Sequence, residues 1–215
     1  MGLSAYRQVL GEERLSRDAR YNALVTQVGQ RIAAVANRPD YAWEFRVIEK
    51  DSANAFALPG GKVAVYTGLF KYTHNEAGLA TVLAHEVAHA LARHGAERVS
   101  QNMLGQLTLG ALQAGVQSGD GIIMQGVRLA YGLGVALPFN RSQELEADHI
   151  GLILMAQAGY DPHEAIALWE RMAADQRGAG PPEFLSTHPA ESSRIQQLER
   201  WLPEALQHYA RARRR

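Results

Sequence analysis

The sequence predicts an α+β fold that is mostly α-helical, with a small β-sheet beside one central helix. Two stretches, residues 43–49 and 62–70, have the alternation and the β-branched residues that are typical of strands. Most later segments instead carry apolar residues at helical spacing. The chain has 215 residues, of which 47% are hydrophobic and 20% charged. This composition is enough for a single globular domain with its own core.

The overall charge excludes some classes of partner. The 22 basic and 22 acidic residues cancel, so nothing in the composition favours nucleic acid or an acidic substrate. The one local bias is the C-terminal run Arg211, Arg213, Arg214 and Arg215, which we interpret as a solvated chain end. Because the chain has no cysteine, disulfides, thiolate catalysis and cysteine-ligated metals are excluded.

The N-terminal third supplies the predicted sheet. Residues 17–37 have one apolar stripe and predict an amphipathic helix, which Pro39 ends. Residues 43–49 alternate between apolar and polar, as in a strand with one buried face. The turn formers Pro-Gly-Gly at 59–61 precede the second predicted strand, residues 62–70. We therefore expect two adjacent strands.

The rest of the chain predicts helices. Thr73 and Glu76 have the spacing of a capping box, and Gly95 is placed to end the helix that follows them. Further helices are expected from Asn140 or Ser142 to about residue 159, from residue 161 to about 175, and after Pro189.

Residues 103–137 are apolar and rich in glycine, with Asp120 and Arg128 as their only charges. Residues 118–121, Ser-Gly-Asp-Gly, divide the stretch into two pieces. Each piece is shorter than the ~20 apolar residues that a membrane span needs. We expect a packed helical hairpin, and the alternative is a mobile lid or a membrane-touching flap beside the site.

The two ends of the chain are expected to lie outside the main fold. Residues 1–20 carry charges throughout and have no apolar core, so we expect neither a signal peptide nor a membrane anchor there. An exported protein would need a targeting segment that this sequence lacks. We interpret residues 1–215 as one domain with an N-terminal extension at 1–16 and a C-terminal tail at 203–215.

The most informative motif is His85-Glu86-Val87-Ala88-His89, inside the helix that is predicted to start near Thr73. Side chains four residues apart on a helix are neighbours, so the imidazoles of His85 and His89 can bind one metal ion. Glu86 lies about 100° around the helix from His85, where it can take a proton from water at the ion. The motif therefore predicts a zinc site with Glu86 as general base.

A catalytic zinc has three protein ligands and one open position, so a third ligand must come from elsewhere. An extended motif with a third histidine is absent, because residue 92 is Ala and residue 95 is Gly. Glu144 and Asp148 are four residues apart and share a helix face, while Glu146 points away. We assign Glu144 to the metal and Asp148 to the outer N–H of a ligating histidine. The alternative is a solvated acidic helix start.

These motifs together resemble a known family. His85 to His89 with Arg93-His94 after it, followed by Glu144-Leu145-Glu146-Ala147-Asp148, is similar to the gluzincin metallopeptidases that include the CAAX-prenyl endoproteases, HtpX and the BepA-like bacterial proteases. Asn54 to Gly61, Thr67-Gly68-Leu69, and Ser186-Thr187-His188-Pro189 with Arg194 resemble the same family. The resemblance covers about residues 19–202. It is greatest to the soluble BepA-like branch, since the membrane spans of the other branches are missing.

The resemblance implies a zincin-type metallopeptidase fold, one zinc ion per chain, and protein or unfolded polypeptide substrates. It also implies a periplasmic or envelope-associated location and a role in the quality control of envelope proteins. Because the matching histidine of the family lies near the metal, we expect His188 at the catalytic site. There it either stabilises the oxyanion or fills the open metal position and switches activity off. The alternative is a surface or capping residue at the start of the following helix. Arg194 is expected to contact substrate. The remaining histidines are interpreted as structural or surface residues: His74, His94, His149, His163 and His208.

The reaction that we expect is hydrolysis of a peptide bond by water at the zinc, with Glu86 moving the proton to the leaving amine. An extended peptide could add to the second predicted strand as to a sheet edge. The candidate substrate-binding residues there are Lys62, Val63, Ala64, Val65 and Tyr66. One alternative function is a zinc-stabilised chaperone that binds clients with latent or no proteolysis. Another is contact with a membrane surface. The oligomeric state is unknown from the sequence.

Overall fold

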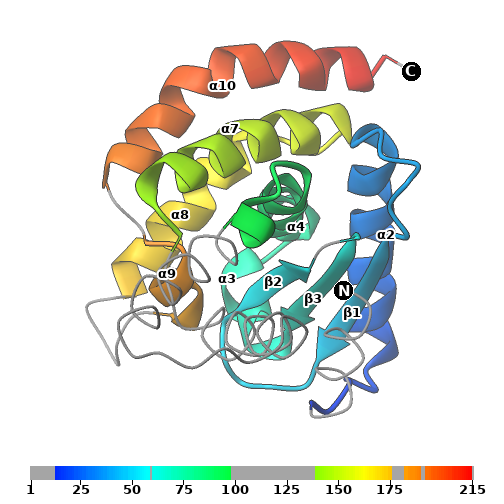
Figure 1. The fold of residues 1–215 in the computed structure, drawn as a ribbon. Helices are drawn as coiled ribbons and strands as arrows, with labels where there is room; N and C mark the ends of the chain where they lie inside the picture. The colour runs from blue at the N-terminus through cyan, green and yellow to red at the C-terminus, as the bar shows by residue number, and fades with distance from the viewer. Residues whose placement is uncertain (1–12, 59, 98–138, 176–181, 190–191, 215) are drawn as a thin grey trace, which may run out of the picture.

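The computed structural model describes residues 13–58, 60–97, 139–175, 182–189 and 192–214. It confirms a mostly helical α+β fold with one small sheet. In Figure 1, α4 lies against the sheet, α7 runs along α4, and α10 covers α7. The apolar stretch 103–137 lies outside the described residues, so its predicted hairpin or lid stays a prediction.

The sheet has three strands, β1 (Glu44–Ile48), β2 (Ala55–Leu58) and β3 (Lys62–Tyr66), in the order β1-β3-β2. β3 pairs with β1 in parallel and with β2 in antiparallel register. Gly60 and Gly61, at φ 90° and 87°, supply the left-handed conformations that the β2–β3 turn needs.

Two expectations about the sheet are wrong. β2 was not predicted, because Ala-Phe-Ala-Leu has no β-branched residue and its strand conformation comes from pairing with β3. β3 is therefore the central strand and not an edge, since both of its sides are hydrogen-bonded along the paired register. It is also shorter than predicted, because η1 (Thr67–Leu69) and α3 (Phe70–Thr73) follow at once.

Helix α2 (Ala19–Val35) confirms the predicted amphipathic helix. Asp18 caps it by accepting a hydrogen bond from the Arg20 backbone N–H. Its buried residues Val25, Val28 and Ile32 form the stripe that packs against β1 and α4. The stripe fixes α2 beside the sheet (Figure 1).

Helix α4 (Glu76–Leu91) is the centre of the fold. Its N-cap is Asn75, whose side chain accepts a hydrogen bond from the Gly78 N–H at 2.8 Å, so the capping box predicted at Thr73 is wrong. Every residue from Gly78 to His89 is buried. This stretch of the helix is thus covered all round, and α4 contacts α2, β2, α7 and α8.

The end of α4 differs from the prediction that Gly95 terminates it. The helix stops at Leu91, and Arg93 adopts φ 59°. This left-handed conformation, usually taken by glycine at helix ends, reverses the chain at a non-glycine residue. His94 then follows the turn instead of continuing the helix.

Four further helices lie in the described ranges after residue 139. α7 (Arg141–Gln157) begins as predicted at Asn140, which forms a capping box with Gln143. α8 (His163–Asp175), α9 (Glu183–Thr187) and α10 (Ser192–Ala212) follow. α10 continues through Pro203, and Ala205 is buried. The predicted tail at 203–215 is therefore helical as far as Ala212.

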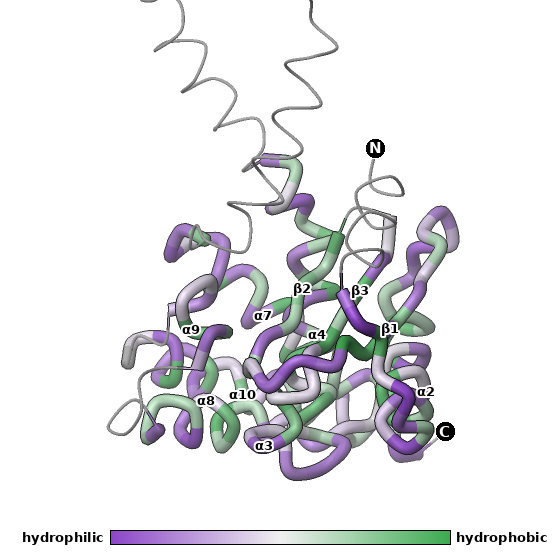
Figure 2. Tube along the Cα trace, turned by 90° about the horizontal axis from the view of Figure 1, so that it is seen from below, coloured by the Kyte–Doolittle hydropathy of each residue, from purple (hydrophilic) through white to green (hydrophobic). Residues whose placement is uncertain are grey.

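The hydrophobic core joins α2, the sheet, α4, α7, α8 and α10. Figure 2 shows hydrophobic stretches on α4 and on the strands that adjoin it. Within the described ranges, no helix combines the length and the hydropathy needed to cross a bilayer. The core thus encloses α4, and with it the predicted site residues.

Candidate metal centre

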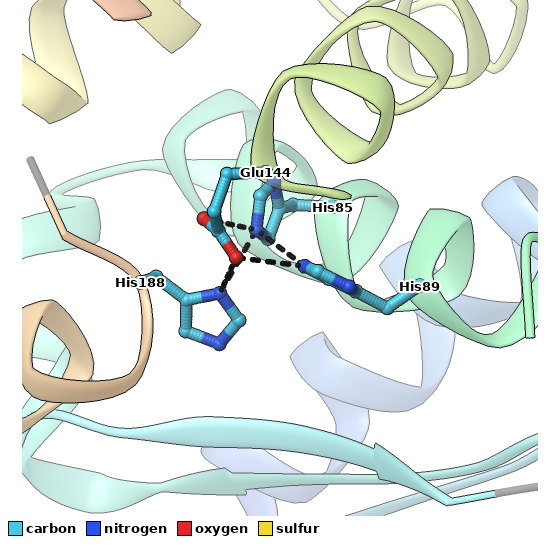
Figure 3. A group of neighbouring side chains, drawn as sticks. All are labelled: His85, His89, Glu144 and His188. Carbon is cyan, nitrogen blue, oxygen red and sulfur yellow. Dashed lines mark hydrogen bonds and ion pairs between the residues drawn. The ribbon is translucent and has the colours of Figure 1, made fainter. Parts of the chain in front are cut away.

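Two histidines point from α4 toward α7 and α9. His85 and His89 are one helical turn apart, and their Nε2 atoms lie 3.0 Å from each other. Both rings are 3% exposed. The predicted pairing of these two imidazoles on one helix face is therefore present in the structure, shown in Figure 3.

Helix α7 brings a carboxylate to the same point. Glu144 Oε1 lies 3.3 Å from His89 Nε2, and Glu144 Oε2 lies 3.5 Å from His85 Nε2. The two helices can approach because Gly151 of α7 faces the backbone of α4. A Cβ at this position would lie only 3.0 Å from the backbone N of His85. The glycine thus sets the distance between the α4 and α7 ligands.

The fourth member of the cluster is His188, at the C-terminal end of the short helix α9. Its Nδ1 lies 2.9 Å from Glu144 Oε1 and 3.2 Å from His85 Nε2. The ring is held between Phe184, which stacks on it at 4.4 Å, and Phe139 at 5.2 Å. His188 therefore approaches the cluster from the side opposite α7 (Figure 3).

These four side chains fit a metal ion. One donor atom from each residue lies within 4.8 Å of the other three, and the nitrogen and oxygen atoms that face one another are 2.9 to 3.5 Å apart. A tetrahedron of ligands 2.0–2.1 Å from a central ion has edges of about 3.3–3.4 Å. Three imidazole nitrogens facing one another, with a carboxylate, have the size and the chemistry of such a ligand set.

The protonation states of three of the four groups, His89, His188 and Glu144, favour metal binding. Burial lowers the pKa of His89 well below its usual value and that of His188 to about 4. Although burial raises the pKa of Glu144, the neighbouring histidines, His188 first, lower it below its usual range. At neutral pH these groups are thus neutral imidazoles and a carboxylate, which are the forms that bind metals.

The outer ring nitrogen of His85, Nδ1, contacts a buried carboxylate. This atom lies 3.1 Å from Asp148 Oδ1, so Asp148 is where the sequence predicted an acceptor for the outer nitrogen. Burial by itself lowers the pKa of His85, but Asp148 and Glu144 outweigh it and raise this pKa to about 9. Ion binding would therefore displace a proton from His85.

Arg194 holds both carboxylates. Its guanidinium donates two hydrogen bonds of 2.7 Å to Asp148 and lies 2.6 Å from Glu144 Oε2. It also stacks over the ring of Trp169 at 3.9 Å. Arg194 is 2% exposed. Its contact with substrate stays a prediction, while its observed contacts orient the carboxylates of α7.

The outer nitrogen of His89 has a different partner. His89 Nδ1 lies 2.9 Å from Nδ1 of His94, and His94 Nε2 lies 3.3 Å from Glu146 Oε2. His94 is 2% exposed, so of the two interpretations, structural or surface, only the structural one agrees with the structure. Sequence reasoning missed His94 because the turn at Arg93, and not helical periodicity, brings it to His89.

Glu86 is buried at the edge of the cluster. Its exposure is 2%, and Oε1 lies 3.4 Å from His188 Nε2. Because His188 Nδ1 faces Glu144, the His188 ring lies between Glu86 and the carboxylate of Glu144. The predicted general base, on α4, is thus next to the site and in contact with His188.

Phe139, just before α7, was not predicted as a site residue. Its ring stacks on His89 at 4.0 Å, and its N–H donates to the Thr187 carbonyl at 3.0 Å.

The predicted substrate strand, β3, is fully buried in the middle of the sheet. The sheet brings β2, and not β3, into broader contact with α4.

Comparisons with known proteins agree with this geometry. The profile of peptidase family M48 matches residues 19–202. The chain is 41% identical over 209 residues to the "Mitochondrial metalloendopeptidase OMA1" of Schizosaccharomyces pombe, which covers 95% of the chain and 61% of that protein. It is 33% identical over 208 residues to the "Beta-barrel assembly-enhancing protease" of Escherichia coli K12, covering 91% and 42%. It is also 34% identical over 203 residues to the "Metalloendopeptidase OMA1, mitochondrial" of Bos taurus, covering 88% and 39%. The chain thus spans less than two thirds of each of these relatives.

Proposed function

The chain belongs to peptidase family M48, and on this basis we propose that it is a zinc-dependent endopeptidase that hydrolyses peptide bonds in protein substrates. The proposal rests on one observation: the side chains of His85, His89 and Glu144 are buried with their donor atoms close together, and Glu86 is buried beside them. A donor set dominated by imidazole favours zinc over magnesium or calcium, which prefer oxygen.

The residues of the chain have distinct roles in this proposal. His85, His89 and Glu144 would hold the zinc, with Asp148 orienting His85. When bound, zinc lowers the pKa of a coordinated water towards ~7 and polarises the scissile carbonyl. The carboxylate of Glu86 accepts a proton from the attacking water and passes it to the leaving amine. Burial of these groups excludes bulk water from the proton path.

We propose that His188 holds the enzyme in a latent state. A catalytic zinc keeps a position open for water, whereas His188 Nδ1 completes a set of four protein donors. We propose that His188 must leave this position before a substrate carbonyl can enter. Glu183 holds α9 in place by accepting hydrogen bonds from the Ser52 hydroxyl and, at 3.1 Å, from the side-chain amide of Asn54. The same closed donor set favours, as the second candidate, a client-binding module with zinc but no proteolysis.

The edge of the sheet supplies a place for substrate. Because β3 is central, the strand that can accept an extended peptide beside α4 is β2, residues 55–58. β2 pairs only with β3 in the described sheet. A peptide could add to its other side by backbone hydrogen bonds. We propose β2 in place of Lys62–Tyr66 as the substrate strand.

We propose a periplasmic or envelope-associated location and a role in protein quality control there. The relatives named for β-barrel assembly support it, and those named as mitochondrial endopeptidases support a peptidase of protein substrates. We propose one catalytic domain for residues 1–215, since the main hydrophobic cluster of the described ranges takes residues from α2 through to α10, beside a smaller cluster on the sheet.

The test is metal content and casein cleavage, measured together for wild type and Glu86→Gln. We expect one zinc per chain in both and cleavage only in wild type, because Gln cannot accept the proton. Cleavage by Glu86→Gln would contradict the role of Glu86. Absence of zinc from both would contradict the metal site.

His188→Ala separates the latent enzyme from the client-binding module. We expect this variant to keep zinc, since three donors remain, and to cleave casein faster than wild type. If wild type and His188→Ala both bind zinc and neither cleaves casein, the client-binding module is the better account. Slower cleavage by His188→Ala would instead assign His188 to stabilisation of the oxyanion.

A further inference from the structure

We propose that His94 is a positioning residue of the metal centre, which fixes the tautomer and the ring orientation of His89 and connects this ligand to Glu146 at the surface. The inference rests on the proposed zinc site, because it takes His89 as a ligand. It concerns a side chain that touches neither the ion nor the substrate.

The backbone is arranged to bring His94 to His89. If α4 continued, residue 94 would lie about 140° around the helix axis from residue 89. The chain instead turns at Arg93, whose φ of 59° is in the left-handed region. The turn returns His94 to the helix that it follows, with its ring 5.0 Å from that of His89. A strained residue at this point is explained by the contact that it makes possible.

The hydrogen bonds determine where the protons lie. If His89 Nε2 faces a metal ion, it has no proton, so the neutral ring carries its proton on Nδ1. The Nδ1–H must then donate to His94 Nδ1, which lies 2.9 Å away. His94 in turn carries its proton on Nε2, which faces Glu146 Oε2 at 3.3 Å. Each group thus sets the tautomer of the one before it.

The outer nitrogen of His89 faces a histidine, whereas that of His85 faces a carboxylate, and this difference has an electrostatic reason. His85 has a buried carboxylate, Asp148, which the guanidinium of Arg194 neutralises. Glu86 and Glu144 are also buried at the site. A further buried carboxylate behind His89 would add charge without a matching cation. His94 supplies a neutral acceptor instead, and its carboxylate, Glu146, is 58% exposed and stays in water.

The test compares zinc dissociation constants, measured by competition with a chelating indicator, for His94→Leu and His94→Asn. Leu fills the space without an acceptor, whereas Asn places its Oδ1 where His has Nδ1 and can still accept from His89. We expect zinc to bind about 10–100-fold more weakly in His94→Leu, with most of the loss restored in His94→Asn. The matched control is His149→Leu, which removes a histidine–carboxylate pair of 3.0 Å on the surface of α7 and should leave the constant unchanged.

Several outcomes would overturn the inference. Zinc binding by His94→Leu as tight as by wild type would do so, as would equal weakening in the Leu and Asn variants, because that pattern reports packing alone. If the His94 variants do not fold, Glu146→Ala serves at an exposed position. For this variant we expect zinc to bind several-fold more weakly. An unchanged zinc affinity would contradict the proposed connection from His89 through His94 to Glu146. Failure of wild type to bind zinc would instead contradict the metal site itself.

Discussion

Gly151→Ala is a small change whose effect on the metal centre can be worked out from the contact between α4 and α7. The added Cβ would lie 3.0 Å from the backbone N of His85 and 3.1 Å from its Cα, where ordinary contacts begin at 3.4 Å. To bring the new Cβ and the His85 nitrogen to an ordinary contact distance, the two helices must separate by about 0.4 Å. Because the contact is with backbone, no side chain can rotate to relieve it. The separation moves Glu144 away from the two histidines.

The expected losses follow from this displacement. Overpacking costs about 1–3 kcal/mol, and replacing a helical glycine by alanine returns up to about 1 kcal/mol, so the free energy of unfolding should fall by about 1 kcal/mol. In a chain of this length that lowers Tm by about 2–4 °C. Metal–ligand distances tolerate only about 0.2 Å, so zinc should bind on the order of tenfold more weakly.

The assays are thermal unfolding of chelator-treated protein and indicator competition for zinc. Gly95→Ala is the matched control, because a Cβ there meets nothing within 4 Å. It should leave the zinc affinity unchanged and, since residues 94–97 are helical, it should not lower the Tm. If Gly151→Ala keeps the Tm and the zinc affinity of wild type, the close contact does not set the distance between the ligands and the reasoning is wrong.

Three further predictions concern single groups. In chelator-treated protein, the pKa of His85, raised to about 9, should stabilise the fold by about 3 kcal/mol below pH 6.5. This stability should disappear as the pH rises through 9. Urea unfolding would measure it, and a flat profile would contradict it. Arg194→Met removes the buried cation that pairs with Asp148 and Glu144 and should lower the free energy of unfolding by about 3 kcal/mol; a loss under about 1 kcal/mol in urea unfolding would argue against it. Arg93→Gly removes left-handed strain at φ 59° and should raise Tm by about 2–4 °C, whereas a fall in Tm on thermal unfolding would show that the side chain matters more than the strain.

The parts of the site that the sequence predicted are those governed by helical periodicity. His85 and His89 on α4, and Glu144 and Asp148 on α7, are each four residues apart, and that spacing determines which side chains share a face. The structure places these pairs opposite each other. The assignment of the residues to zinc remains a prediction for the experiments to test.

The parts that sequence reasoning missed depend on local reversals and on tertiary pairing. β2 is a strand because β3 pairs with it, although its own residues favour strand only weakly. His94 reaches His89 through a left-handed arginine, and residues other than Gly, Asn and Asp seldom adopt that conformation. Neither effect has a period, so neither is visible in a pattern of apolar residues.

X-ray absorption at the zinc edge of the loaded protein tests the central claim most directly. If His85, His89, Glu144 and His188 surround the ion, the spectrum should show four nitrogen or oxygen neighbours at about 2.0–2.1 Å. Three of them should give the outer-shell scattering of imidazole, and His188→Ala should lose one of these. Six oxygen neighbours, or a spectrum with fewer than two imidazoles, would contradict the proposed ligands.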